Sequence, residues 1–420
     1  MNLFEGLGPI IIYTIVLLLW TCKHIIVCRS YTITAFILSM YTITAISAVL
    51  FYYLYSSRVG YVNITLLGFI KWMCIFIVCM LPIISFDRLL IKQYTVRYGI
   101  INTIGVVAFF TGIIPIIELL PRIVDVFSNF GNFLLSASDI HDSDVKELGL
   151  SFIGETCMRV DRWLYDFSFV VLIPLYQNKN RYKFAFYGFC SVILAKHFPN
   201  ILQVSRGGLL ILIMNTICIL LIYRFCLSKK NIKRIYMSAA CLILSIVLLF
   251  AGITLSRQSD YDVKLGDYSL DYFLLKYAGE PPLNYNEWAE NAKSTLDGNL
   301  TLFAFKRIIG SDVENIDREF YYSSESKMGI PLNIFYTYIG DFVLDVGYPI
   351  SLIIFSIISY LLINILRRRS RFLSLSDLFI LYIYIHTIAF GYNGYIYTGS
   401  GSQLLIIDFI IYIILRLCKT

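Results

Sequence analysis

Charged residues are scarce in this sequence. Only 15% of its 420 residues are Asp, Glu, Lys or Arg, whereas 58% are hydrophobic. A soluble globular chain carries about 25% charged residues. The mean hydropathy of +0.72 points the same way, so water is excluded as the main solvent of this protein.

The motifs of several enzyme classes are also missing. The sequence contains no metal-ligand spacing, nucleophile elbow, phosphate loop or dinucleotide fingerprint. Its four histidines, His24, His141, His197 and His386, are dispersed, and none lies in residues 256–333. We therefore expect no metal and no cofactor.

Cysteine usage and charge exclude further classes. The ten cysteines form neither a disulfide framework nor a metal pattern, because most lie in or beside apolar stretches and only Cys157 falls clearly in an expected external loop. The first apolar segment, Leu3 to Trp20, lacks a basic start and a small-residue cleavage site, so we expect a retained span.

The net charge of +7 comes from short basic clusters between apolar segments, which membrane topology explains, so no nucleic acid partner is expected.

Apolar stretches dominate what is present. Many approach roughly 20 residues, the length of helix that crosses about 30 Å of hydrocarbon, and they do not alternate as barrel strands do. The sequence therefore predicts an all-α integral membrane protein with about 11 transmembrane helices. The expected spans are 3–22, 31–55, 62–83, 98–120, 164–176, 184–198, 207–223, 235–255, 347–366, 374–391 and 402–418. The fifth and sixth are short, so we expect them to tilt little, borrow flanking residues or form a re-entrant pair.

Basic residues predict the orientation. Lys and Arg gather in every second connection, and such residues are retained on the cytoplasmic side. The N-terminus is then extracytoplasmic and the C-terminus cytoplasmic. The expected organisation is residues 1–255 with eight helices and an external loop at 121–163, one long extracytoplasmic loop at 256–333, and three helices in 334–420.

The segment Gln203 to Leu209, at the outer end of the seventh expected span, is a candidate anion site. Ser205 is a suitable N-cap, and the following Gly207 and Gly208 allow a ligand to approach the backbone at the positive end of the helix dipole. Arg206 adds a bidentate cation suited to phosphate. The alternative is an interfacial arginine that reaches lipid phosphates.

Two carboxylates mark a second segment, which runs from Gly329 to Pro349. Asp341 and Asp345 are four residues apart, so an amphipathic helix at the outer surface would carry both on one face. Near a membrane such groups need water, a cation or a substrate hydroxyl as partner. Simple solvation at the entrance of the next span is the alternative.

Other candidates surround these segments. Arg307 and Arg318 in the long loop would supply a second cation for a lipid diphosphate. His197 shares an outer connection with Arg206, whereas His386 lies inside the tenth span, either as a functional group or as a hydrogen-bonded core histidine. Four outer tyrosines are candidates for saccharide contact: Tyr321, Tyr322, Tyr336 and Tyr338.

The two segments, in this order and separated by a long external loop, resemble bacterial O-antigen polymerases of the Wzy type, also called oligosaccharide repeat-unit polymerases. Ser205 to Gly208 followed by an aliphatic span is similar to the arginine-glycine segment of that family, and Pro331 to Gly347 is similar to its later segment. The resemblance covers Gln203 to Leu366 and the topology. Pro349 departs from it, because the family often has a second glycine near that position.

The resemblance implies a metal-independent glycosyltransferase of the bacterial cytoplasmic (inner) membrane. A growing glycan would move from undecaprenyl diphosphate onto a lipid-linked repeat unit on the outer face, within O-antigen or other surface polysaccharide biosynthesis. Arg206 and a loop arginine would neutralise the leaving diphosphate. Asp341, Asp345 or His197 would accept the proton of the acceptor hydroxyl. The implied partners are the lipid-linked oligosaccharide, membrane lipid and a polysaccharide chain-length regulator.

Two other functions remain open. An O-antigen ligase shares this architecture but is expected to use a histidine of its large loop, and residues 256–333 contain none. A lipid-linked oligosaccharide flippase or other transporter would need polar residues through the centre of the bundle. Charges deep within the expected spans are few, chiefly Lys71, Glu118 and Asp408.

Overall fold

The protein is a helical, multi-pass membrane protein. The computed structural model describes residues 3–89, 93–129, 149–203, 206–227, 233–241, 243–245, 270–311, 318–332, 334–367 and 372–417. Among these residues, five helices are long and apolar enough to cross a membrane: α1 (Leu3–Cys28), α2 (Ile33–Val59), α3 (Leu66–Arg88), α4 (Tyr98–Ser128) and α15 (Tyr348–Arg367). The all-α membrane class is thus confirmed, whereas the count of about eleven spans and the orientation stay predictions.

The chain forms two compact units. Unit 1 comprises Met1–Leu90, Asp271–Arg371 and Tyr384–Ile406, and unit 2 comprises Ile91–Leu270, Phe372–Ile383 and Ile407–Thr420. Each unit combines segments that are far apart in sequence. The boundary passes within α16 (Leu375–Phe390) and α17 (Ser402–Leu417). The division into 1–255, 256–333 and 334–420, which follows topology and not compactness, stays a prediction.

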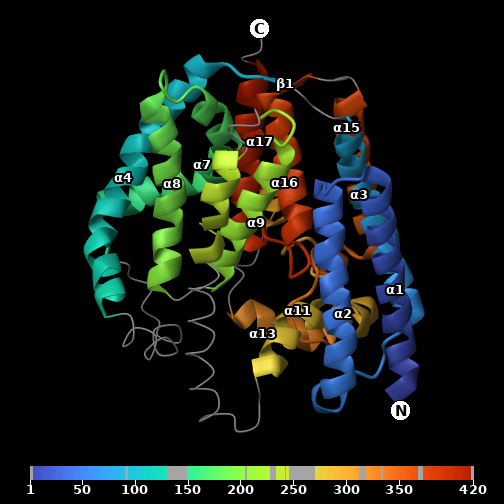
Figure 1. The fold of residues 1–420 in the computed structure, drawn as a ribbon. Helices are drawn as coiled ribbons and strands as arrows, with labels where there is room; N and C mark the ends of the chain where they lie inside the picture. Colours follow the sequence, from blue (N-terminus) through green and yellow to red (C-terminus); the bar gives the residue numbers. More distant parts are fainter. Residues whose placement is uncertain are drawn as a thin grey trace. The chain divides into compact units, whose positions relative to one another are not determined.

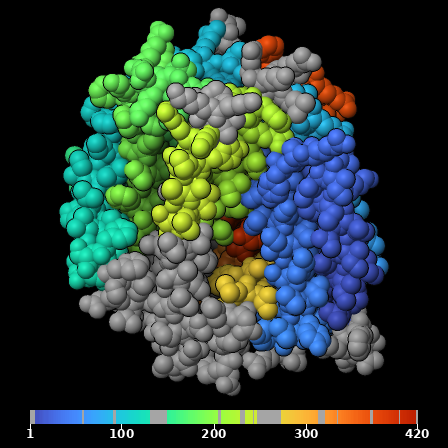
Figure 2. Space-filling view, in the orientation of Figure 1, coloured from blue at the N-terminus to red at the C-terminus, as the bar shows by residue number. Residues whose placement is uncertain are grey.

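Unit 1 contains α1 to α3, α15 and the helices of the expected long loop. Those helices are α11 (Leu270–Glu287), η1 (Ala289–Asn291), α12 (Phe303–Ile308) and α13 (Arg318–Met328), followed by α14 (Tyr338–Val346). Helices α1 and α2 lie side by side (Figure 1) and form part of the visible surface of unit 1, in blue (Figure 2). They leave large apolar side chains exposed, such as Leu19 and Ile26 at 64% and 72%. Such a surface suits lipid as solvent.

Unit 2 is built from α4, α7 (Phe152–Gln177), α8 (Lys183–Leu202) and α9 (Arg206–Ile222), with a further helical stretch at 233–241. Two three-residue strands, β1 (Gln93–Thr95) and β2 (Phe372–Ser374), pair in parallel, and a short 3-10 turn, η2 (Gly399–Gly401), precedes α17 in unit 1. Within the described residues, every other element is helical.

Helix starts follow from local sequence. The side chains of Thr32, Thr65, Ser151 and Thr337 each accept a hydrogen bond from a backbone N–H in the first turn of the helix that follows. This satisfies a donor that the helix itself leaves unpaired. Helix α2 ends at Gly60, whose positive φ of 78° allows its N–H to reach the Ser56 carbonyl.

Small residues bring α4 and α8 into close contact, as Figure 1 shows. A Cβ atom added at Gly188 would lie 2.0 Å from the Gly105 carbonyl oxygen, and one added at Gly112 would lie 2.3 Å from the Ser191 hydroxyl. Helices in lipid associate through such backbone contacts because there is no hydrophobic driving force between them.

Helices extend into both ends of the expected external loop at 121–163. Helix α4 continues to Ser128, and α7 begins at Phe152, so Cys157 lies in a helix. The short fifth and sixth segments do borrow flanking residues, since α7 has 26 residues and α8 has 20. The prediction failed at α7 because its first turns carry charges that lower the local hydropathy without breaking the helix.

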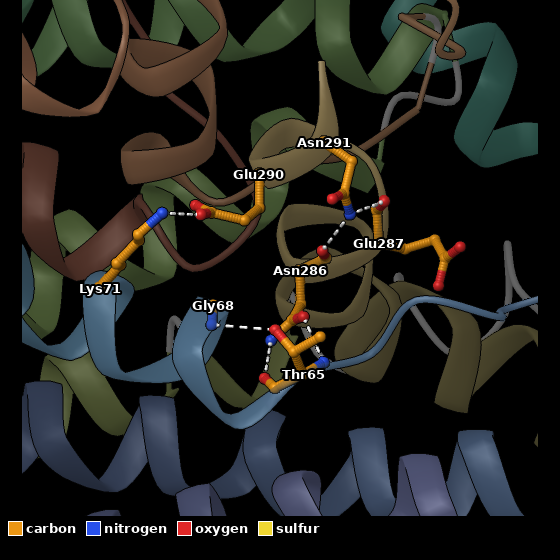
Figure 3. A network of polar contacts seen from close by, with 7 residues as sticks. All are labelled: Thr65, Gly68, Lys71, Asn286, Glu287, Glu290 and Asn291. Atoms are coloured by element: carbon orange, nitrogen blue, oxygen red, sulfur yellow. Dashed lines mark hydrogen bonds and ion pairs between the residues drawn. The ribbon is translucent and has the colours of Figure 1, made fainter. Parts of the chain in front are cut away.

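A polar network holds the expected long loop against α3 and the connection that precedes it within unit 1 (Figure 3). Glu287 is 1% exposed and accepts the N–H groups of Val62 and Asn63 over 2.9 and 2.6 Å. Asn286 both accepts from the Thr65 N–H and donates to its carbonyl, each over 2.8 Å. Lys71, a charge within an expected span, pairs with Glu290. This part of the long segment is therefore an ordered, packed structure.

The α4–α8 contact yields a test. Gly188→Ala should lower the free energy of unfolding by about 1–3 kcal/mol, because the new methyl group overlaps the α4 backbone. Gly99→Ala is the matched control, since a Cβ at Gly99 meets nothing within 4 Å. Thermal unfolding of the purified proteins in detergent measures both. Equal melting temperatures for the two variants would contradict the close approach.

Candidate functional site

Helix α9 begins at Arg206, where the sequence predicted a helix start. Ser205 lies outside the described residues. Gly207 is exposed, and a Cβ added there would meet nothing within 4 Å, so the first turn of α9 faces open space. At Gly208 a Cβ would lie 2.1 Å from the Asn200 side chain, so α9 packs against the last turn of α8. The two glycines thus differ: Gly207 gives access, and Gly208 allows packing.

His197 lies in a polar chain beside this helix start. Its Nε2 is 2.7 Å from the Tyr165 hydroxyl of α7, and its Nδ1 is 3.2 Å from the Asn200 amide. The Asn215 amide of α9 donates to the same Tyr165 hydroxyl over 3.4 Å. Since His197 is only 4% exposed and both ring nitrogens have partners, its arrangement suits holding α7, α8 and α9 in register more than accepting a proton from a substrate.

Asp408, on α17 in unit 2, is one of the isolated charges that the sequence predicts deep in a span. Its carboxyl lies beside that of Asp166 on α7, and the two side chains are 2% and 7% exposed. Glu118 has partners, because it accepts hydrogen bonds from the Ser151 N–H and hydroxyl at the start of α7.

Asp345, in unit 1, is buried and fully engaged. It accepts the N–H groups of Leu300 and Thr301 over 2.9 and 2.6 Å, together with the Thr301 hydroxyl. Burial raises the pKa of Asp345, and these hydrogen bonds oppose the rise. Its oxygens are occupied in anchoring the turn that precedes α12, so it has no free position for a substrate proton.

Asp341 differs from Asp345, although both lie on α14. It is half-buried, and its Oδ2 accepts the Tyr395 N–H over 2.5 Å. Burial raises the pKa of Asp341 well above its usual value, and the charge of Asp345 raises it further, against the lowering effect of the Tyr395 hydrogen bond. A carboxylate with a raised pKa and partial access to solvent is a candidate general base.

Helix α14, expected as an amphipathic helix at the outer surface, is packed inside unit 1, and its position relative to the membrane stays a prediction. Seven of its nine residues are buried. The Thr337 hydroxyl, at its N-cap, accepts a hydrogen bond from the Trp72 indole of α3, and the Tyr338 N–H bonds the Gly391 carbonyl. The alternation of Asp and apolar residues signalled an amphipathic helix, but on its polar side Asp345 faces other protein segments, and only Asp341 keeps partial access to solvent.

The candidate saccharide-binding tyrosines divide by exposure. Tyr336 and Tyr338 are 2% and 0% exposed, so a sugar would reach neither ring without a rearrangement. Tyr322 is 70% exposed, and Tyr321 is half-buried close enough to Asp341 for its pKa to be raised, after burial, by that carboxylate.

The long segment also contains a polar pocket of about 450 Å³ in unit 1. It lies between the turn at 295–299 and α13, and its lining includes Asp297, Asn299, Ser323, Lys327 and Phe320. Arg307 is exposed on α12, and Arg318 begins α13. The lining thus combines carboxylate, amide and hydroxyl groups with one aromatic ring. These groups can form hydrogen bonds with several hydroxyl groups of one ligand.

The candidate residues therefore fall into two groups. Asp341, Asp345, Tyr336, Tyr338, Arg307 and Arg318 belong to unit 1, whereas His197, Arg206, Gly207 and Gly208 belong to unit 2. Sequence patterns missed Tyr165, Asn200 and Asn215, because isolated polar residues in apolar helices carry no motif. They are recognisable only as polar groups that need partners in an apolar bundle.

His386 is 3% exposed in unit 1 and packs near the Phe390 ring, 6.5 Å between centroids. It is therefore a core residue in this structure. In the part of the chain that the structure describes, no group of three or more His, Cys, Asp or Glu side chains is arranged to hold a metal ion.

Comparison with known proteins identifies no relative: no protein-family model matches the chain, and neither a curated protein nor a solved structure is significantly similar to it.

The role of Asp345 can be tested by stability. Asp345→Asn should lower the free energy of unfolding by about 2 kcal/mol, because an amide keeps one acceptor and turns an N–H group toward the Thr301 donors. Asp297→Asn, at a carboxylate whose side chain is 71% exposed, is the control and should have little effect. Melting temperatures in detergent give the comparison. An unchanged value for Asp345→Asn would show that the anchor is dispensable.

Proposed function

We propose that this protein is a surface polysaccharide polymerase of the O-antigen type. It would transfer a growing glycan from undecaprenyl diphosphate to a lipid-linked repeat unit on the outer face of the bacterial inner membrane, with its N-terminus outside and C-terminus in the cytoplasm. The proposal rests on the resemblance of Ser205–Gly208 and Pro331–Gly347 to the family segments, in a multi-pass helical protein.

The start of α9 is the observation that carries the proposal. Arg206 opens a helix whose first turn is open at Gly207, so a phosphate can approach free N–H groups at the positive end of the helix dipole. A guanidinium at this position would stabilise the charge that develops on a diphosphate as the glycosidic bond breaks.

Asp341 is the proposed general base. Of the three candidates, Asp345 and His197 have their polar atoms engaged, whereas Asp341 is half-buried and accepts one hydrogen bond, at Oδ2, from the described residues. It would take the proton of the acceptor hydroxyl as that oxygen attacks the anomeric carbon. Tyr321 and the polar pocket beside α13 would contribute saccharide contacts.

Replacing Arg206 tests the phosphate site. In a deletion strain, wild-type protein should restore long glycan chains, and Arg206→Ala should abolish them at equal protein level, because the leaving diphosphate loses its cation. Arg234→Ala, at an exposed arginine on an expected cytoplasmic connection, is the matched control and should behave as wild type. The measurement is the glycan ladder on gels. Normal chains from Arg206→Ala would refute the assigned role.

The deletion strain itself separates the three functions. Loss of a polymerase leaves a single repeat unit on the lipid core, loss of a ligase leaves long chains on the lipid carrier, and loss of a flippase leaves no surface repeat. We expect the first result.

Asp341 should impose a pH dependence. A base acts in its deprotonated form, so the polymerisation rate should rise as pH increases through the raised pKa of Asp341 and level off above it. Asp341→Asn should lose the activity in that upper range and the pH dependence with it. The measurement is initial rate against pH with lipid-linked repeat units in nanodiscs. A wild-type profile in the variant would assign the base elsewhere.

A further inference from the structure

Two cations of unit 2, Arg162 on α7 and Lys196 on α8, flank the hydrogen bond between Tyr165 and His197, because Arg162 is three residues before Tyr165 and Lys196 directly precedes His197. Arg162 is exposed and Lys196 is half-buried. Their charges are close enough to repel, and Lys196 also feels the attraction of Asp166. Asp166 also lies beside Asp408, so its carboxyl is not a dedicated partner of Lys196.

Neither cation has an ion-pair partner among the described residues. The ion pairs found there join Lys71 to Glu290, Arg159 to Glu155, and Lys327 to Asp297. Arg159 is the informative comparison, because it stands one turn before Arg162 on α7 and has a carboxylate 4.0 Å away. Holding like charges together in a partly buried place costs free energy, which an anionic ligand would offset.

Contacts between the helices place these cations at the start of α9. Tyr165, which bonds His197, is one turn from Arg162, and Lys196 precedes His197 directly. Lys196 is also four residues before Asn200, so the two share a face of α8, and Asn200 is the side chain against which Gly208 packs. All of these residues belong to unit 2. Lys196 is thus about 9 Å along the helix axis from the end of α8, near the open first turn at Gly207.

We infer that Arg162 and Lys196, together with the first turn of α9, bind the diphosphate of the lipid-linked substrate. The inference rests on the proposed function for the identity of the ligand. It places the additional cations on α7 and α8 and not at Arg307 and Arg318 of the expected long loop. The whole phosphate site then lies on helices of one unit. The planar guanidinium of Arg162 suits two oxygens of one phosphate, and the point charge of Lys196 suits either phosphate group.

Binding of undecaprenyl diphosphate tests this assignment directly. The full-length protein is placed in nanodiscs, and the lipid is titrated with native mass spectrometry as readout. Arg162→Gln and Lys196→Met should each weaken binding about tenfold or more, because each removes a charge-assisted contact. Arg162→Lys and Lys196→Arg retain charge and should restore most of the affinity, which separates a charge role from a folding defect.

Matched controls come from the same helices. Arg159→Gln on α7 removes a cation that already has a carboxylate partner, and Lys183→Met removes an exposed cation at the other end of α8. Both should bind the lipid within about twofold of wild type. Melting temperatures of all variants identify any that fail to fold.

Two competition experiments identify the ligand. Inorganic pyrophosphate competing as well as the lipid would show that the site reads free phosphate and not a lipid headgroup. Phosphatidylglycerol competing equally would show that the cations merely face bulk lipid, which overturns the assignment. If wild type binds undecaprenyl diphosphate and the Arg162 and Lys196 variants bind it equally well, the inference fails while the proposed function stands. If wild type neither binds the lipid nor restores polymer in cells, the proposed function fails with it.

Discussion

A polar side chain inside an apolar helix bundle must find its partner within the protein, and this constraint underlies the positions of the candidate residues. Glu287 shows it most clearly, because its buried carboxylate is satisfied only by N–H groups of the α2–α3 connection. Removing those donors would leave a buried charge unpaired. The same requirement joins Lys71 to Glu290 and Asn286 to Thr65, so the segment after α11 is held on the membrane helices by its polar residues (Figure 3).

The constraint also separates two carboxylates that the sequence presents as equivalent. Asp341 and Asp345 are one turn apart on α14, yet Asp345 meets the turn at Leu300 and Thr301, whereas Asp341 meets a single N–H of Tyr395. The first becomes a structural anchor, and the second keeps partial access to solvent. Their partners come from segments distant in sequence, so the difference arises only when the chain is folded.

In unit 2 the close packing of α4 on α8 has a comparable effect. Glycines at 105 and 188 allow the two backbones to touch, and α7 and α9 then pack beside α8 through Tyr165, His197 and Asn200. Polar residues of three helices are thereby brought to one end of the unit, where α9 begins. Arg162 and Lys196 lie there because of this register, although nothing in their local sequence distinguishes them from other interfacial cations.

The sequence by itself determined the solvent of this protein and the positions of its long apolar helices. In hydrocarbon a long apolar stretch must satisfy all of its backbone groups within itself, so it forms a helix. The start of α9 at Arg206 and the caps at Thr32 and Thr337 follow from local rules. Only the tertiary structure decided that α7 extends through its charged first turns, that α14 is buried, and which polar residues meet. A pattern of polar and apolar residues records that a side chain needs a partner, but the partner's identity depends on contacts between distant segments.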